Sequence, residues 1–532
     1  MKLGSNGMIA DMTPLSTQAD PEAGQLPWGL LLPVFVGPFM ALLDLSIVTV
    51  ALPAVQSGLH TGFSSLQWVV DAYTLTLSAL LLSAGSLGDR YGRRRLYLTG
   101  MAVFTIGSAI CAASPDIGVL IVGRIVQGAG ATSLIPGSLS ILTQAFPEPA
   151  RRARMIGLWN GFGALAIAAG PILGGVLVQE VGWWAIFLIN LPVGAATVIV
   201  GARSIPETSD RAHAATDPAG QVAGIVWLAA LTFGFIQAGT HGWAAPATVV
   251  PLVVAVAGFA AFLAIEARGS HPMLPLGLFS DRMFAVANLA SFALGFGAFS
   301  LFTYLSLYLQ DVQGYSALSA GLRYLPLCGA LAVMNVYSGR LTGRVGPRLG
   351  MAVGYTVAGG ALLALVGLDP GTSYVVVAGV FLAYGIGVGL SVTPTTAAAM
   401  GSVQRQRSGI ASGTVNATRQ AGNTCGIAIL GSIITARAIS QLRHALVSPN
   451  LSGAQAQHIA TVTVTSDGAG SVNGTQLSAA GLHRLYGSAF VSGFHLAVLI
   501  AGTVTLLAAA LAFAQLRTRS AAHEQSATGR RP

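Results

Sequence analysis

The chain has 532 residues, of which 53% are hydrophobic and only 8% are charged, and its mean hydropathy is +0.69. Soluble domains carry about 25% charged residues, so this composition excludes that class and indicates a protein with many membrane-spanning helices. The net charge of +9 does not indicate nucleic acid binding, because the arginines are dispersed over predicted loops, where they orient the chain and contact anionic lipid.

Apolar segments long enough to span a membrane recur along the whole chain. A transmembrane helix needs about 20 mostly apolar residues, and we predict an all-α polytopic membrane protein with 14 transmembrane helices. The predicted spans are residues 29–52, 67–87, 96–114, 118–142, 155–178, 185–203, 219–238, 247–267, 283–309, 318–338, 350–368, 373–396, 409–434 and 488–515.

Basic residues gather in alternate connections between these spans. An even number of spans places both termini on one side, and cytoplasmic loops collect Lys and Arg. Of the predicted outer loops, only the last, residues 435–489, contains any, namely Arg437, Arg443 and Arg484. We therefore expect a multi-pass protein of a bacterial inner membrane with both termini cytoplasmic.

The polar first 27 residues indicate that the first span is an uncleaved helix rather than a removable signal peptide. Cys111, Cys328 and Cys425 fall in three separate spans, so we infer neither a disulfide nor a metal site.

Four charged residues fall clearly inside predicted spans: Asp44, Asp71, Arg124 and Arg419. Ionisable groups in a membrane are costly and by default functional. The first three lie in the outer half of the first six spans. Burial favours the neutral form of a carboxylate and a neighbouring arginine favours the charged form, so such a site can load and release a proton. A purely structural ion pair is the alternative.

The loop after the second span, GSLGDRYGRRRL at 85–96, recurs as GRLTGRVGPRLG at 339–350, after the tenth span. Gly85 and Gly92 permit tight turns and close helix approach. Asp89 can cap the third span or pair with an arginine, and Arg90 and Arg93 hold the loop on the inner side. The alternative is a simple orientation signal with a helix cap.

The repeat indicates two six-helix halves separated by an inserted pair of helices, an organisation that transporters commonly have. The predicted units are an N-terminal cytoplasmic tail (1–27), a first six-helix bundle (28–203), a cytoplasmic linker (204–218), the inserted helix pair (219–267), a second six-helix bundle (268–515) and a C-terminal cytoplasmic tail (516–532). The outer loop 435–489, rich in Ser, Gly, Thr and Ala with one strand-like stretch, TVTVTS, is predicted to be a partly ordered excursion with a short hairpin.

The fifth span contains GPILGG at 170–175. Pro171 removes a backbone donor and bends the helix, while Gly170, Gly174 and Gly175 let another helix pack closely. Ordinary packing of a kinked helix is the alternative.

The second half offers no buried carboxylate, so we expect its spans to supply mainly polar and aromatic contacts to a central cavity. The candidates for that cavity are Asn160 from the first half with Tyr304, Asn335, Arg419 and Gln420 from the second. Each could instead make a hydrogen bond between helices.

Several motifs together resemble one known family. They are LDLSIVTVALP at 43–53, GSLGDRYGRRR at 85–95, RIVQGAGA at 124–131, GPILGG at 170–175, IFLINLPVG at 186–194, SLYLQDVQGYSALSAGLRYLP at 306–326 and SGIASGTVNATRQAGNTCGIAILG at 408–431. They resemble the drug/proton antiporter family with fourteen transmembrane helices, within the major facilitator superfamily.

The resemblance implies roles for these motifs. The loop at 85–95 would be a latch that forms in the outward-facing state, weaker in the second copy, where Gly343 replaces Asp89. GPILGG would seal the exporter against proton leak. Asp44 and Arg124 stand at the family's acidic first-helix and basic fourth-helix positions. We hypothesise that Asp44 is the principal proton carrier, with Arg124 tuning it and Asp71 as a second acid or cation contact.

We therefore predict a proton-coupled antiporter, not an enzyme, that exports lipophilic, amphiphilic or cationic drugs, dyes or antibiotics by alternating access. Its partners would be the substrate, protons and membrane lipids, with no nucleic acid and no cofactor, and we expect a monomer. A dedicated exporter of one antibiotic or metabolite is the close alternative. An importer, or a non-transporting sensor or scaffold, are further alternatives.

Overall fold

The computed structural model describes residues 28–528 except 60, 62, 147, 209–216, 270, 271, 273, 275, 404–407, 447–451 and 466–478. All regular secondary structure in these ranges is helical, which confirms the all-α part of the predicted fold class. Twelve helical segments among the described residues are long and apolar enough to cross a membrane. The predicted tail at 1–27 lies outside the described residues.

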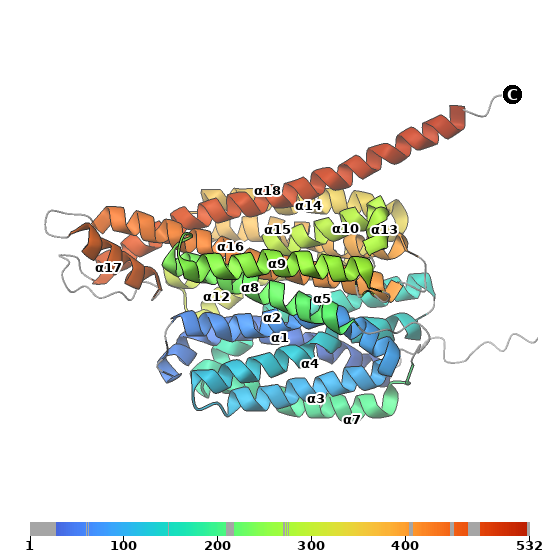
Figure 1. The fold of residues 1–532 in the computed structure, drawn as a ribbon, viewed down its shortest axis with the longest axis horizontal. Coiled ribbons are helices and arrows are strands. Elements are labelled where there is room, and N and C mark those ends of the chain that lie inside the picture. The colour runs from blue at the N-terminus through green and yellow to red at the C-terminus, as the bar shows by residue number, and fades with distance from the viewer. Residues whose placement is uncertain are drawn as a thin grey trace, which may run out of the picture.

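The first group of helices forms one side of the molecule (Figure 1). Within it α3 packs on α4, α1 on α5 and α2 on α4. These helices are α1 (Trp28–Leu59), α2 (Phe63–Tyr91), α3 (Arg93–Ala112), α4 (Ile117–Ala145), α5 (Pro149–Glu180), α6 (Ala185–Leu188) and α7 (Asn190–Ser204).

The last group of helices forms the opposite side, with α14 and α18 along its edge (Figure 1). Its helices are α10 (Arg282–Ala293), α11 (Ser300–Leu307), α12 (Ala317–Arg323), α13 (Leu325–Val345), α14 (Pro347–Ala364), α15 (Tyr374–Gly401), α16 (Ser408–Leu446), α17 (Gly453–Thr465) and α18 (Ala479–Thr528). Short 3₁₀ turns, η1 (Leu276–Ser280) and η4 (Leu365–Gly367), flank α10 and α14.

Two π-helical turns interrupt the ninth predicted span. They are η2 (Leu294–Phe299), between α10 and α11, and η3 (Tyr308–Val312), after α11. Such turns are rare and are frequently found at functional sites. Here η2 packs against α16.

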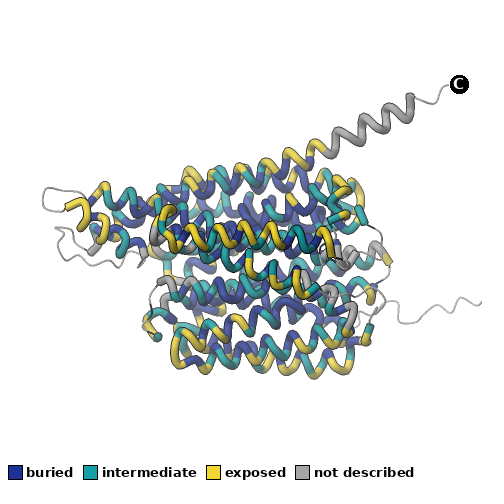
Figure 2. The backbone as a smooth tube through the Cα atoms, viewed as in Figure 1, coloured by how far each residue is buried: buried dark blue, intermediate teal, exposed yellow. Residues whose placement is uncertain are grey.

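A pair of helices, α8 (Pro218–His241) and α9 (Pro246–Arg268), lies across the two groups (Figure 1). α8 contacts α16 and α2, one helix from each group. α9 leaves a row of valines exposed, with Val253 at 62% and Val256 at 70% exposure. Figure 2 shows that exposed positions recur along this helix. In a membrane this apolar face would lie against lipid tails.

The predicted hairpin in the outer loop is wrong where the structure describes that loop. α16 continues to Leu446, and the TVTVT stretch belongs to the helix α17. Ala456, Ala460 and Val464 are buried at intervals of four residues, and α17 packs against α16. This helical spacing of apolar residues outweighs the strand preference of the alternating Thr and Val residues.

Candidate functional site

A cavity of about 220 Å³ lies between the two groups of helices. Its walls come from α1, α2, α4 and α5 on one side and from η2, α11, α13, α15 and α16 on the other. Most of the described lining residues are apolar or carry neutral polar groups, and Arg419 is the only charged one. A largely apolar wall with a few polar groups is typical of small-molecule sites.

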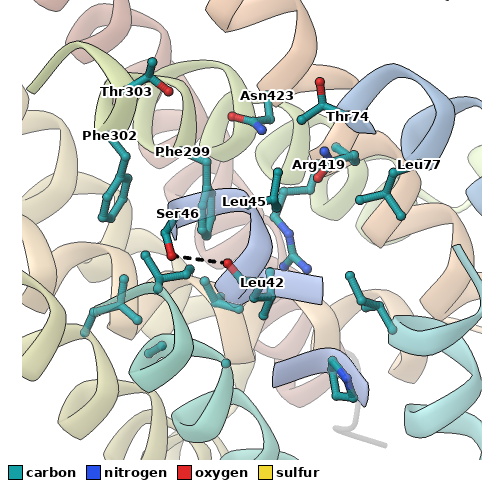
Figure 3. Close-up of a pocket in the computed structure, with 18 of the residues that line it drawn as sticks. Leu42, Leu45, Ser46, Thr74, Leu77, Phe299, Phe302, Thr303, Arg419 and Asn423 are labelled. Carbon is teal, nitrogen blue, oxygen red and sulfur yellow. Dashed lines mark hydrogen bonds between the residues drawn. The ribbon is translucent and has the colours of Figure 1, made fainter. Parts of the chain in front are cut away.

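The first helix faces the cavity on one side and its own bundle on the other. Leu42, the adjacent pair Leu45 and Ser46, and Thr49 line the cavity, and the spacing of three or four residues from one to the next places them on one face of α1. Figure 3 labels the first three. Asp44 lies on the other face and is 1% exposed. The carboxylate is therefore separated from the cavity by its own helix.

Asp44 forms an ion pair with Arg124 of α4. Arg124 donates from Nη1 to Asp44 Oδ2, and both side chains are fully buried. Arg124 Nε also donates to the carbonyl of Val69 on α2 at 2.9 Å, and its guanidinium lies 4.4 Å from the centre of the Tyr73 ring. Arg124 thus links its own helix, α4, to α1 and α2 beside the Asp44 carboxylate.

Neutral polar residues extend this pair into a network. Gln127 Nε2 donates to Asp44 Oδ1 at 3.1 Å and to Ser108 Oγ at 2.7 Å, while its Oε1 accepts from Arg124 Nη1 at 2.9 Å. Asn190 of α7 donates to Ser108 Oγ at 3.2 Å. Gln127, Ser108 and Asn190 are not among the site residues predicted from the sequence, although Gln127 follows Arg124 by three residues and so lies on the same helix face.

Asp71, the third predicted member, is not hydrogen-bonded to this pair. It is 3% exposed, and its Oδ2 has no hydrogen-bond partner among the described residues. The hydroxyl of Tyr304, on α11, belongs to a buried side chain. That hydroxyl donates to the carbonyl of Ile427, and Tyr304 is not among the described residues that line the cavity.

The glycines of the GPILGG segment bring α5 against α1. A Cβ atom on Gly170 would lie 1.9 Å from Ser46 Oγ and 2.9 Å from the backbone nitrogen of Ile47. A Cβ atom on Gly174 would lie 3.0 Å from Ile47 Cγ1. Ser46 and Ile47 follow Asp44 within one helical turn, so this close contact fixes the part of α1 that carries the acid.

The same segment also contacts the second group of helices. A Cβ atom on Gly175 would lie 3.2 Å from the backbone of Leu318 on α12. Pro171 lines the cavity, and its Cβ lies against Gly321, where an added Cβ would be only 2.6 Å away. One short segment of α5 therefore touches the acid-bearing helix, the cavity and the opposite half.

The repeated loops share a backbone feature. Gly92 has φ of 103° and Gly346 has φ of 82°, and each precedes the first turn of a helix, α3 or α14. These angles favour glycine strongly. The side chains of Asp89 and Arg90, together with the surroundings of Gly85, lie outside the described residues.

The linker after α7 is hydrogen-bonded to the start of α3, directly after the first of these loops. Glu207 accepts hydrogen bonds from the backbone amides of Arg94 and Arg95, both at 3.2 Å, and the Arg93 amide donates to the carbonyl of Thr208 at 3.0 Å. A carboxylate is favourable at a helix N-terminus, where backbone donors are unpaired. Glu207 is not predictable as the cap of α3 from local sequence, because it lies far along the chain from that helix.

Replacing Glu207 by Ala is expected to lower the free energy of unfolding by about 1 kcal/mol, the typical cost of losing a helix cap. Thermal unfolding of the purified protein measures this. Glu180→Ala, which removes another acid at the exposed end of α5, is the control and should change stability by less than about 0.5 kcal/mol. Equal effects of the two changes would contradict the capping role.

The positions of the other cavity candidates can be compared with the residues that line the cavity. Asn160, Asn335, Arg419 and Gln420 all line the cavity, together with Asn423. Figure 3 shows Arg419 and Asn423 of α16 lining the same cavity as Phe299 and Phe302. Asn335 Oδ1, Gln420 Nε2 and Asn423 Oδ1 have no hydrogen-bond partner among the described residues. These amides are free to bind a ligand.

Comparison with known proteins places the chain among transporters. The sequence model of the Major Facilitator Superfamily matches residues 34–427. The chain is 38% identical over 401 residues to the multidrug resistance protein Stp of Mycobacterium tuberculosis (75% of this chain, 74% of that protein). It is 37% identical over 412 residues to the methylenomycin A resistance protein of Bacillus subtilis (76% and 87%).

A longer match covers nearly the whole chain. The tetracenomycin C resistance and export protein of Streptomyces glaucescens is 32% identical over 511 residues, 94% of this chain and 93% of that protein. Among solved structures, the human organic anion transporter MFSD10 (TETRAN) superposes with a TM-score of 0.57 over 89% of this chain and all of that chain, at 16% identity. This last similarity concerns the fold alone.

Proposed function

Because the chain belongs to the Major Facilitator Superfamily, we propose that it is a proton-coupled efflux transporter of the cell membrane that exports amphiphilic drugs, dyes or antibiotics by alternating access. The observation that carries the proposal is a cavity between two helical groups with a buried carboxylate–arginine pair directly behind its wall. The relatives are named for multidrug resistance and for resistance to, or export of, single antibiotics. The second kind of name supports the alternative, a dedicated exporter of one compound.

The proposed architecture has fourteen spans. α2 and α13 would complete the twelve segments that satisfy the length and composition criteria, since α2 carries the cavity-facing residues Val70, Thr74 and Leu77 and α13 carries Leu331 and Asn335. The proposed halves are residues 28–203 and 268–515, with α8 and α9 as the inserted pair. Contacts of α5 with α12 and α13, and of α2 with α16, join the halves.

The two faces of α1 suggest how the halves would couple substrate to protons. Substrate would contact the face with Leu45 and Ser46, while Asp44 on the opposite face is paired with Arg124. A small rotation or shift of α1 during rocking would separate the pair and open Asp44 to protons. Asp71, with one carboxylate oxygen unpartnered, would be a second acid near the interface of the halves.

The loop at 85–95 is proposed as the latch of this cycle. Gly92 provides its turn and Glu207 holds the start of α3, so the loop has a fixed backbone on which Asp89, Arg90 and Arg93 can act. A Cβ atom on Gly346 would meet no atom of the described residues within 4 Å, whereas one on Gly92 would lie 2.5 Å from Glu207 Oε1. The second loop is expected to be held less firmly.

Proton release from everted membrane vesicles tests the proposed function. Vesicles containing the protein and acidified inside are expected to lose luminal protons when an exported compound is added, because antiport exchanges one for the other. A pH-sensitive dye measures this loss, and vesicles without the protein are the control. Uptake that persists after the gradient is collapsed contradicts proton coupling, and absence of any transport favours the sensor or scaffold alternative.

A further inference from the structure

The charge of the cavity gives a more specific conclusion about what is exported. Arg419 is the only charged residue among the described lining residues, so none of them carries a carboxylate. We propose that the exported compounds are acidic amphiphiles whose anionic group binds Arg419 while their apolar rings lie against the aromatic wall. This inference rests on the proposed export function and narrows its substrate class.

Arg419 is held in place from its backbone side. A Cβ atom on Gly295, in the π turn η2, would lie only 1.9 Å from the carbonyl oxygen of Arg419, so η2 and α16 are in direct backbone contact. The guanidinium donates from Nη2 to Asn416 Oδ1 and lies 5.9 Å from the centre of the Phe299 ring. The side chain is thereby oriented at the cavity wall.

Arg419 has no acidic partner in the part of the chain that the structure describes. A guanidinium in a low-dielectric site is costly unless a counter-charge accompanies it. Arg124, the other arginine that falls clearly inside a predicted span, has its partner in Asp44. The planar donors of Arg419 match the two oxygens of a carboxylate or an acidic enol, which makes an anion from the cavity the natural counter-charge.

The other residues that line the cavity indicate which groups the ligand carries besides its anionic group. Phe299 and Phe302 are stacked at 6.1 Å, and Phe302 and Tyr324 at 6.2 Å, which gives a flat surface for aromatic rings. Near it Gln420 Nε2 and Asn423 Oδ1 have no hydrogen-bond partner among the described residues. They can bind a hydroxyl or carbonyl of the same molecule. A polycyclic aromatic acid with polar substituents fits this arrangement.

The sequence alone predicted cationic as well as amphiphilic substrates. A cation in this cavity would be repelled by Arg419 and would find no carboxylate among the described lining residues. A like charge at a binding site is an effective way to exclude ligands of the wrong charge. Asp44 does not compensate, because it is paired and lies on the far face of α1.

Two dyes with the same ring skeleton test the inference: fluorescein, an acid, and rhodamine 123, a cation. Everted vesicles are expected to accumulate fluorescein and not rhodamine 123. Arg419→Gln is expected to reduce fluorescein uptake about tenfold or more through a higher KM, the loss that one charged hydrogen bond implies. Arg419→Lys should retain part of the uptake. Arg437→Gln, which removes an exposed arginine from the same helix, should change nothing.

The outcomes separate the inference from the function on which it rests. Uptake of rhodamine 123 alone overturns the acidic substrate class and leaves proton-coupled export standing. Fluorescein uptake that is the same in Arg419→Gln as in the unaltered protein also overturns the inference. Uptake of neither dye contradicts both the inference and the proposed export of dyes.

Discussion

Replacing Asp44 by Asn is expected to abolish proton-driven export, leaving uptake at the level of vesicles without the protein. The carboxylate is the only acid bonded to Arg124 among the described residues, and both of its oxygens accept hydrogen bonds, one from Arg124 and one from Gln127. An amide has nearly the same shape but cannot take up and release the proton. Substrate-induced proton release from everted vesicles measures the loss.

The ion pair complicates this experiment, because Asp44→Asn leaves Arg124 buried without a counter-charge. Removing one partner of a buried pair costs about 3–5 kcal/mol of stability, so thermal unfolding must be measured with transport. The double variant Asp44→Asn with Arg124→Gln removes both charges and should recover much of the stability while remaining inactive in coupling. This separates the loss of the proton carrier from the loss of folding.

Asp71→Asn is the matched comparison on the neighbouring helix. Asp71 is buried but has no ion pair in the described part of the chain, so its replacement should cost less stability and should reduce export without abolishing it. If the stable double variant still drives export with the proton gradient, Asp44 is not the carrier. If Asp71→Asn alone stops export, Asp71 and not Asp44 is the principal proton carrier.

Charged residues were the most informative part of the sequence. Asp44 and Arg124 could be paired in advance because a charge inside a span needs a partner and both were expected at a similar depth. Asp71 was expected at that depth too, yet no hydrogen bond joins it to the pair. The direction in which the Asp71 side chain points depends on how α2 is rotated about its axis. The hydropathy pattern of a helix that is buried on several sides does not define that rotation.

Other features depend on contacts distant in the sequence. Ser108 and Asn190 join the Asp44 network from α3 and α7, but neutral polar residues in spans are too common to be singled out individually. The Glu207 cap depends on the path of the linker. The π turn at Gly295, which places Arg419, has no sequence pattern distinct from an ordinary helix containing glycine.

Gly170→Ala is expected to stop export and to raise proton leak, because the added methyl group would force α1 and α5 apart. Its Cβ would meet Ser46 Oγ at 1.9 Å and the Ile47 backbone nitrogen at 2.9 Å. Rotation of the serine would relieve the first contact only, since the second involves backbone. Overpacking of this kind costs about 1–3 kcal/mol, and the displaced segment of α1 carries Asp44.

Gly161→Ala is the matched control on the same helix, where the added Cβ would make an ordinary contact of 3.5 Å with Val336 Cγ2. It should leave both export and the decay of an imposed pH gradient unchanged. Ser46→Gly combined with Gly170→Ala should restore part of the activity, because it removes the side chain that the methyl group meets. Full export by Gly170→Ala alone would show that the close approach of α1 and α5 beside Asp44 is not needed for coupling.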